Sequence, residues 1–127
     1  MTVHRQQLGK LGEDLALAEL QTRGYALLTR NYRTGFGEVD IIAQDKNTLC
    51  FVEVRTRMSE DQGHPLESIT PEKKRKLIRC AMCYLEESGK WESETRFDVV
   101  AIIPQEEGQF GIEIVRDAFS MDPEENL

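Results

Sequence analysis

Two acidic side chains stand on neighbouring runs of β-forming residues, where they could do chemistry together. The stretch GEVDIIAQDKNTLCFVEVRTR, residues 37–57, carries Asp40 in its first run and Glu53 in its second, with a polar break between them. A two-residue loop at Lys46 and Asn47 would close this break as a β-hairpin. In the register that such a loop sets, Asp40 lies directly opposite Glu53.

The apolar residues of the predicted hairpin favour the same register. The pairing divides the side chains between two faces, and a slip of one residue would mix the two sets. One face is then entirely apolar, and the charged residues share the other. The predicted pairs are Val39–Val54, Ile41–Val52 and Ala43–Cys50 on the apolar face, and Glu38–Arg55, Asp40–Glu53 and Ile42–Phe51 on the other.

The charged face has two interpretations. It can be an ordinary solvated surface with an ion pair between Glu38 and Arg55, since most surface charges do no more than that. However, like charges opposed across strands destabilise a hairpin by up to about 1 kcal/mol, and a bound cation would reverse the sign of this interaction. Mg²⁺ commonly takes one or two carboxylates together with substrate phosphates. The second interpretation is therefore that Asp40 and Glu53 hold Mg²⁺ (or Mn²⁺) in a site suited to phosphodiester hydrolysis.

The charge of the chain is unevenly distributed, and this bears on its partners. The formal net charge is -7, but residues 91–127 hold ten acids against two arginines, so the first 90 residues sum to +1. Within them, KKRKLIR at residues 73–79 gathers five cations. Local clusters decide phosphate binding more than the total charge does, so the net acidity does not exclude a nucleic-acid partner.

Length and composition indicate a single intracellular domain. A chain of 127 residues is the size of one hydrophobic core. No stretch is apolar for long enough to span a membrane, and the N-terminus lacks the apolar run of a secretory signal, so we expect a cytoplasmic protein. Cys80 and Cys83 form a lone C-x-x-C inside a predicted helix. No second pair completes a zinc site, so core packing is the better interpretation of these cysteines.

Two helices are predicted, one on each side of the acidic hairpin in the sequence. The N-terminal helix ends before Gly24, and its apolar residues repeat at helical spacing. They are Leu8, Leu11, Leu15 and Ala18. The second helix has sharp boundaries: Thr70 is a suitable N-cap, Pro71 suits the first helical position, and Gly89 ends the apolar repeat.

The other patterns complete an α/β fold. Strands are expected at residues 25–33 and 96–104, and residues 110–119 form a last strand or a strand entering a short helix. The order α-β-β-β-α-β, followed by this final element, predicts a mixed β-sheet flanked by helices. We expect one domain at residues 1–120 and an acidic tail at residues 121–127 that is frayed.

Five segments, in this order along the chain, resemble the YraN-like proteins, a family of small bacterial proteins. They are LGKLGEDLALAEL, GEVDIIA, FVEVRTR, TPEKKRKL and RFDVVAI. This family is similar to archaeal Holliday junction resolvases within the restriction-endonuclease-like superfamily. The resemblance implies the restriction-endonuclease-like αβββαβ core, a homodimer, and the superfamily motif PD-(D/E)xK.

Carried over to this chain, the motif implies four catalytic residues. Asp40 matches its first acid, Glu53 its second acid, and Arg55 takes the place of the lysine, while Glu13 stands where resolvase-like members use an acid of the first helix. Val39 replaces the motif proline, which is a minor change. Arg55 stays protonated and cannot take a proton from water, so we assign it to stabilising charge in the transition state.

The cations of the predicted second helix would contact the nucleic-acid backbone. The candidates are Lys73, Lys74 and Lys76 near the helix N-terminus, which itself favours anions, and Arg33 and Arg57 near the ends of the catalytic strands. An ordinary solvated face is the alternative. Backbone contacts position a duplex without reading its bases, so shape-selective binding is expected.

These features lead to three functional hypotheses. The first is a metal-dependent endonuclease that hydrolyses branched or structured DNA. The second is a non-catalytic nucleic-acid-binding or adaptor module that keeps the nuclease fold, and it is motivated by Arg55 and the net acidity. The third is an interaction protein in which the acids have only a structural role.

Overall fold

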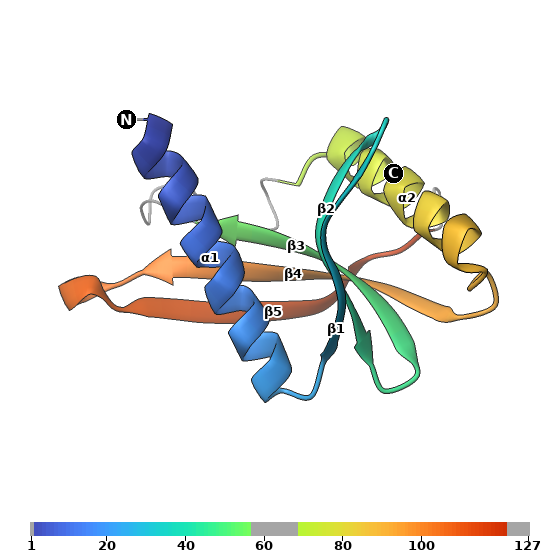
Figure 1. Cartoon of the computed structure of the whole chain (residues 1–127). Helices are drawn as coiled ribbons and strands as arrows, with labels where there is room; N and C mark the ends of the chain where they lie inside the picture. Colours follow the sequence, from blue (N-terminus) through green and yellow to red (C-terminus); the bar gives the residue numbers. More distant parts are fainter. Residues whose placement is uncertain (1, 57–68, 122–127) are drawn as a thin grey trace.

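The computed structural model describes residues 2–56 and 69–121, apart from the side chains of residues 2–6 and 8. A five-stranded mixed sheet has one long helix on each face (Figure 1). The elements are α1 (Thr2–Thr22), β1 (Ala26–Thr34), β2 (Gly37–Asp45), β3 (Thr48–Thr56), α2 (Pro71–Ser88), β4 (Glu94–Pro104), the 3₁₀ turn η3 (Glu106–Gly108) and β5 (Phe110–Phe119). This architecture confirms the predicted α/β class and is consistent with a restriction-endonuclease-like core.

The strands follow one another in chain order, β1-β2-β3-β4-β5. All neighbours are antiparallel except β3 and β4, which are parallel because α2 lies between them in the chain. The final element is a strand along its whole length, which decides between the two predictions for residues 110–119.

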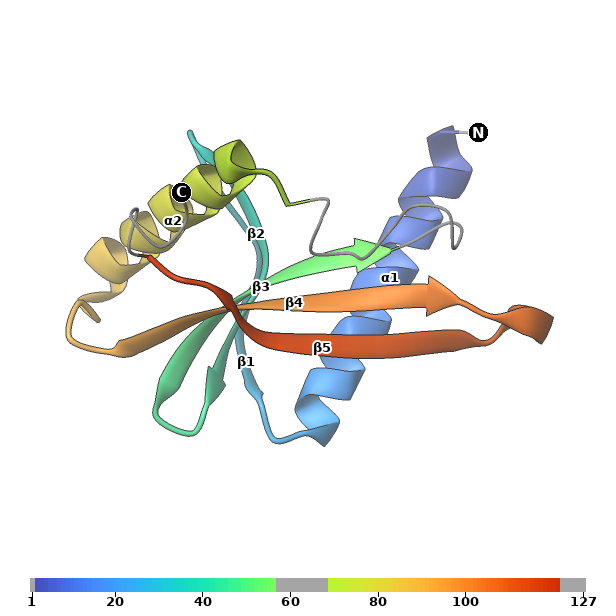
Figure 2. The same cartoon turned by 180° about the vertical axis from the view of Figure 1, so that it is seen from behind.

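Two hydrophobic clusters hold the helices on opposite faces of the sheet. Ala16 and Leu20 of α1 pack with strand residues in one cluster. Leu11 and Ala18 of the predicted apolar repeat are exposed instead, because a neighbouring face of the helix meets the sheet. On the other face α2 packs over β1 and β2, as the view from behind shows (Figure 2). The buried residues of α2 are Leu77, Cys80, Ala81 and Leu85. Cys80 is thus a core residue, as predicted, whereas Cys83 is only half-buried.

The helix α2 begins and ends where the sequence predicted. Thr70 is extended and its hydroxyl accepts a hydrogen bond from the Lys73 N–H at 3.1 Å, which satisfies a helical N–H that has no partner within the helix. Pro71 occupies the first helical position, and Gly89 ends the helix in the left-handed conformation with a φ of 68°. The sequence therefore fixes where α2 begins relative to the acidic hairpin.

Residue 1, residues 57–68 and residues 122–127 lie outside the described part of the chain. Of the predicted acidic tail, Met121 packs against the cluster under α2, and residues 122–127 are outside the described residues. Within the described residues, no helix is long and apolar enough to cross a membrane.

Candidate active site

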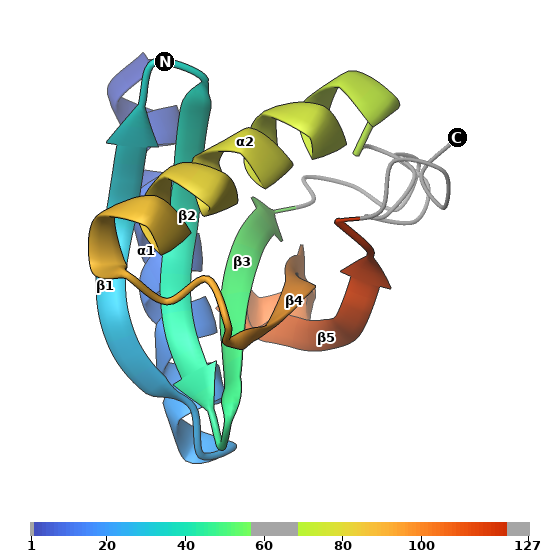
Figure 3. The ribbon, with the colours of Figure 1, turned by 90° about the vertical axis from the view of Figure 1, so that its right-hand side faces the viewer.

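The candidate site lies where β2 and β3 separate. The two strands are paired from Asp45–Thr48 to Ile41–Val52, which confirms the predicted register. Beyond Ile41 the strands spread apart (Figure 3). There the Asp40 Oδ2 atom accepts a hydrogen bond from the Val54 N–H at 2.8 Å. The Asp40 side chain thus reaches across the opening between the strands.

One part of the predicted hairpin is wrong. Val39 was expected to share a face with Ile41 and Ala43, but it belongs to the cluster under α2, whereas Ile41 and Ala43 belong to the cluster under α1. The alternation of side chains along β2 changes between Val39 and Ile41, and Asp40 lies at this change. Asp40 and Glu53 are consequently not paired in the ladder, but their carboxyl groups remain neighbours, as predicted.

Glu53 is buried on the α2 side of this opening, with only 4% of its surface exposed. Its Oε2 atom lies 2.8 Å from Lys73 Nζ and 3.6 Å from Arg55 Nε. These are ion pairs by distance, but among the described residues no aligned hydrogen bond reaches this buried oxygen. The closest cation to this oxygen is the Lys73 ammonium, so a further ligand would share the oxygen with Lys73 or replace it.

The pKa of Asp40 is raised from 3.8 to about 8. Burial is the main cause, and the neighbouring Glu53 carboxylate and a hydrogen bond with it add to the effect, against the opposing influence of the Val54 N–H. Carboxyl groups that share a site disfavour each other's charge in this way. The like-charge cost expected from the sequence is therefore present in the fold.

Glu13 on α1 joins the same cavity. A hollow of about 570 Å³ is bordered by Glu13, Glu38, Asp40 and Glu53, and by Lys73 and Lys76 of α2. Burial raises the pKa of Glu13, and Arg30 opposes this shift. The nearby carboxylates of Glu38, Asp14 and Glu53 raise the pKa of Glu13 further. The cavity therefore combines carboxylates that repel one another with cations at a helix N-terminus.

The donor set of this cavity fits a hard divalent ion. Within the described residues, no group of three or more His, Cys, Asp or Glu side chains is arranged as a metal site. Mg²⁺ needs fewer protein ligands, because waters and substrate phosphates fill the rest of its octahedron. Asp40 and Glu53 supply two carboxylates, and the buried Oε2 of Glu53 lacks an aligned donor.

The other predicted residues are placed unevenly around the cavity. Lys73 and Lys76 border it, whereas the Lys74 ammonium lies over the Phe119 ring, 5.6 Å from its centroid. Arg33 pairs with Glu38 at 3.1 Å, whereas Arg55 lies 3.6 Å from Glu53 rather than beside Glu38 as the predicted pairing had it. Arg57 is outside the described residues.

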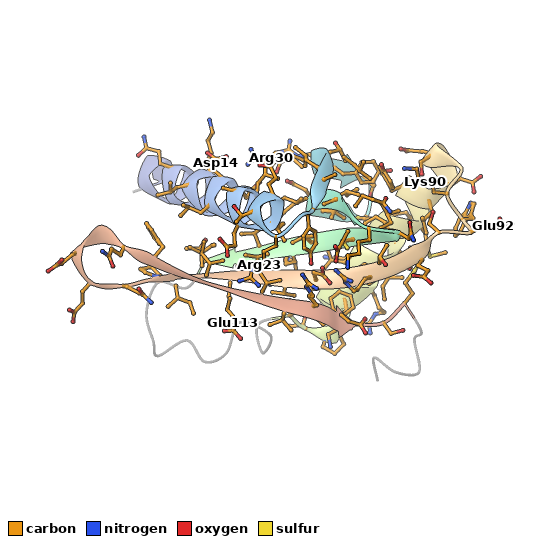
Figure 4. The ribbon with its side chains drawn as sticks, turned by 90° about the horizontal axis from the view of Figure 1, so that it is seen from below. Asp14, Arg23, Arg30, Lys90, Glu92 and Glu113 are labelled. Carbon is orange, nitrogen blue, oxygen red and sulfur yellow. The ribbon has the colours of Figure 1, made fainter. Side chains whose placement is uncertain are left out.

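A second hollow of about 520 Å³ adjoins the first and shares Glu13 and Glu38 with it. Its cations are Lys10, Arg30 and Arg33. Figure 4 shows Arg30 of β1 beside Asp14 of α1, and their NH2 and Oδ1 atoms are 2.9 Å apart. This ion pair ties α1 to the edge strand next to the candidate site.

Asn31 and Glu38 are site residues that the sequence analysis missed. With its amide nitrogen turned toward the acids, Asn31 donates hydrogen bonds to Glu38 Oε1 at 2.8 Å and to Glu13 Oε1 at 3.0 Å. Asn31 has a φ of 53°, an unusual conformation inside a strand. The only sequence signal was the position of Glu38 two residues before Asp40, which we interpreted as a surface ion pair.

Comparisons with known proteins agree with the resemblance. The model of a family described as "Uncharacterised protein family UPF0102" matches residues 12–102. A UPF0102 protein of Prosthecochloris aestuarii is 47% identical over 124 residues, which cover 94% of this chain and 98% of the relative. A UPF0102 protein of Desulfosudis oleivorans is 45% identical over 119 residues, 94% of each chain.

Proposed function

The chain belongs to the uncharacterised protein family UPF0102, the YraN-like family, and we propose that it is a metal-dependent endonuclease that hydrolyses phosphodiester bonds in DNA. One observation carries the proposal. The pair formed by the half-buried Asp40 and the buried Glu53, with the pKa of Asp40 raised to about 8, opens into the same cavity as Lys73 and Lys76. Perturbed carboxylates beside phosphate-binding cations are typical of a catalytic site.

Asp40 and Glu53 would hold Mg²⁺ or Mn²⁺. When bound, the ion would supply an activated water and neutralise charge on the phosphate. The raised pKa of Asp40 supports this assignment, because a divalent cation would relieve the repulsion that now disfavours its charge.

The cations of α2 bind and orient the substrate in this proposal. Lys73 neutralises Glu53 at 2.8 Å in the absence of a metal ion. Once the charge of Glu53 is compensated otherwise, the Lys73 ammonium can bind a phosphate oxygen at the positive end of α2. Lys76 is more than half exposed at the mouth of the cavity and can bind the next phosphate.

Arg55 stabilises charge in this proposal. Its Nε atom is buried and lies 3.6 Å from the Glu53 carboxylate, which borders the cavity, although Arg55 itself is not one of the bordering residues. A guanidinium stays protonated at neutral pH and therefore cannot act as the base. Its charge and its fork of donors suit a phosphate that gains negative charge in the transition state.

The substrate class follows from the resemblance and from the type of contact. Branched or structured DNA is the substrate of the resolvases that the family resembles. The cations that border the cavity, Lys73 and Lys76, suit phosphates, and contacts with phosphates select the shape of a nucleic acid rather than its bases. Glu13 would orient the attacking water or hold a second ion.

A cleavage assay tests the proposal. Linear, flapped and four-way-junction DNA are incubated with the protein in Mg²⁺, in Mn²⁺ and in EDTA. We expect metal-dependent cleavage that Asp40→Asn and Glu53→Gln abolish. Glu92→Gln, at an exposed position after α2, is the matched control and should cleave as the wild type does. The proposal fails if none of the DNAs is cut, or if Glu53→Gln cuts as fast as the control.

A non-catalytic nucleic-acid-binding module is the second candidate, and one contact favours it. Because Lys73 already compensates Glu53, the site can persist without a metal ion. This alternative predicts binding to DNA that weakens steeply with salt, and no cleavage in either metal. Binding that is absent or insensitive to salt would contradict it.

A further inference from the structure

The outer side of α2 carries an exposed apolar hollow, separate from the candidate active site. Phe36, Met82 and Trp91 line it and are 45%, 43% and 50% exposed. The hollow measures about 500 Å³, and its other lining residues are Arg79, Cys83, Glu86 and Glu87. Figure 3 shows α2 with the sheet behind it, and no other described helix or strand lies over its outer side. Three large apolar side chains gathered at one exposed site indicate an interaction surface.

The charges along this side of α2 are ordered. Glu72 is exposed in the first turn, Arg75, Lys76 and Arg79 in the following two turns, Met82 after them, and Glu86 and Glu87 in the last turn. The Arg79 guanidinium lies over the Phe36 ring, 5.3 Å from its centroid. The Glu86 Oε2 accepts a hydrogen bond from the Trp91 indole N–H at 2.6 Å. Both charges are thus held beside the apolar rings.

This order of charges complements the same order on a second α2 helix that runs in the opposite direction. Arg79 precedes Met82 by about one helical turn, and Glu86 follows it by about one turn. In an antiparallel pair of α2 helices centred at Met82, Arg79 of each copy therefore faces Glu86 of the other. The helix dipoles also oppose each other in this arrangement, which is favourable.

We propose that the outer side of α2 binds the same side of a second copy of this chain, in a two-fold symmetric dimer. In such a dimer, each contact occurs twice. The rings of Phe36, Met82 and Trp91 form the apolar centre, and the Arg79–Glu86 pairs flank it. A partner of a single charge would leave either Arg79 or Glu86 unmatched, whereas a second copy matches both.

Charge exchange tests the dimer without reference to activity. The mass of the full chain is measured by light scattering during gel filtration over a range of concentrations. We expect a particle of twice the chain mass at high concentration for the wild type. Arg79→Glu and Glu86→Arg should each be monomeric, because each places like charges in contact. An equimolar mixture of the two variants should again dimerise, because both flanking pairs are restored between unlike chains.

The double variant Arg79→Glu/Glu86→Arg should also dimerise. Gln21→Arg, which adds a charge at an exposed position of α1, is the control and should leave the dimer intact. Thermal unfolding of each variant confirms that it is folded. A wild type that stays monomeric at every concentration overturns the proposal. So does a mixture of folded single variants that stays monomeric, as it would if α2 bound a segment of its own chain or another protein.

Discussion

The surroundings of Asp40 disfavour the ionised form of its carboxyl group. Burial and the Glu53 carboxylate raise its pKa from 3.8 to about 8, while the Val54 N–H holds it in place. The fold therefore tolerates an unfavourable group at the end of the β2–β3 ladder. Such a cost at a single residue is typical of a functional site, because packing alone would remove it.

The pH dependence of stability tests this residue. Because the folded-state pKa of Asp40 is raised, the folded protein binds a proton that the unfolded chain has lost, and stability falls as the pH rises from about 4 to about 8. Asp40→Asn removes this loss. In EDTA at pH 8 we expect the variant to be more stable than the wild type by about 1–3 kcal/mol, measured by urea unfolding.

With divalent ions present, the wild type should become more stable than Asp40→Asn. Mg²⁺ or Mn²⁺ should raise the melting temperature of the wild type and leave that of Asp40→Asn nearly unchanged, because an ion that binds only the folded state stabilises it. A wild type that responds to neither ion would favour a purely structural role for the acids.

At the scale of elements, the approach of α1 to the sheet decides where Glu13 lies. Gly12 faces Thr56 of β3, and a Cβ atom at Gly12 would collide with the Thr56 Oγ1 atom. Gly9, one turn earlier, has no atom within 4 Å of such a Cβ. A glycine is therefore needed at residue 12 for packing and is dispensable at residue 9.

Two glycine substitutions in α1 separate packing from helix propensity. Gly9→Ala should stabilise the protein by up to about 1 kcal/mol, since alanine is the better helix former. Gly12→Ala should destabilise it by about 1–3 kcal/mol, because the added methyl group overpacks the contact with Thr56. Urea unfolding measures both. Adding Thr56→Ala to Gly12→Ala should recover part of the loss, and equal effects at both glycines would contradict the proposed close packing.

A buried polar cluster fixes β4 beside the hairpin end of the sheet. Asp98 is 1% exposed and accepts hydrogen bonds from the Tyr25 hydroxyl at 2.9 Å and the Arg96 Nε–H at 2.8 Å. Its Oδ1 also accepts the Asp117 N–H at 2.9 Å, and Arg96 reaches Asp45 at 2.8 Å. These bonds satisfy Asp98 within the protein, so the cluster has a structural role.

Removing the cation of this cluster should be costly. Arg96→Ala leaves the buried Asp98 charge without its partner, and we expect a loss of about 3–5 kcal/mol in the free energy of unfolding. Arg23→Ala is the control, because it breaks only the exposed ion pair with Glu19 at 3.2 Å and should cost less than about 1 kcal/mol. Equal losses in chemical denaturation would show that the cluster contributes little.

At the scale of the whole molecule, the cavity has cations at its border although the chain as a whole is acidic. The net charge of -7 is concentrated in the last third of the sequence, while Lys73 and Lys76 border the cavity. Binding of DNA would therefore depend on a few local phosphate contacts, and its salt dependence should correspond to that number of contacts.

Neighbouring lysines of α2 distinguish this local binding from general attraction. Lys76→Gln should weaken DNA binding by a few-fold and lower the slope of log K against log salt by roughly 1, since one phosphate contact is lost. Lys74→Gln also removes one positive charge, but the Lys74 ammonium lies over the Phe119 ring, so this substitution should have a much smaller effect. Fluorescence anisotropy at several salt concentrations measures both. Identical losses would indicate binding by overall charge instead.

The sequence by itself determined the elements and the register of the acidic hairpin. Thr70, Pro71 and Gly89 set the limits of α2, and the apolar alternation paired Ile41 with Val52, because caps and periodicity are local properties of the chain. The tertiary structure alone decided that Val39 turns to α2, that Lys73 reaches Glu53 while Lys74 does not, and that Asn31 joins Glu13 to Glu38. These contacts depend on where both helices cross the sheet and on where β2 leaves β3, and no local pattern of residues encodes either.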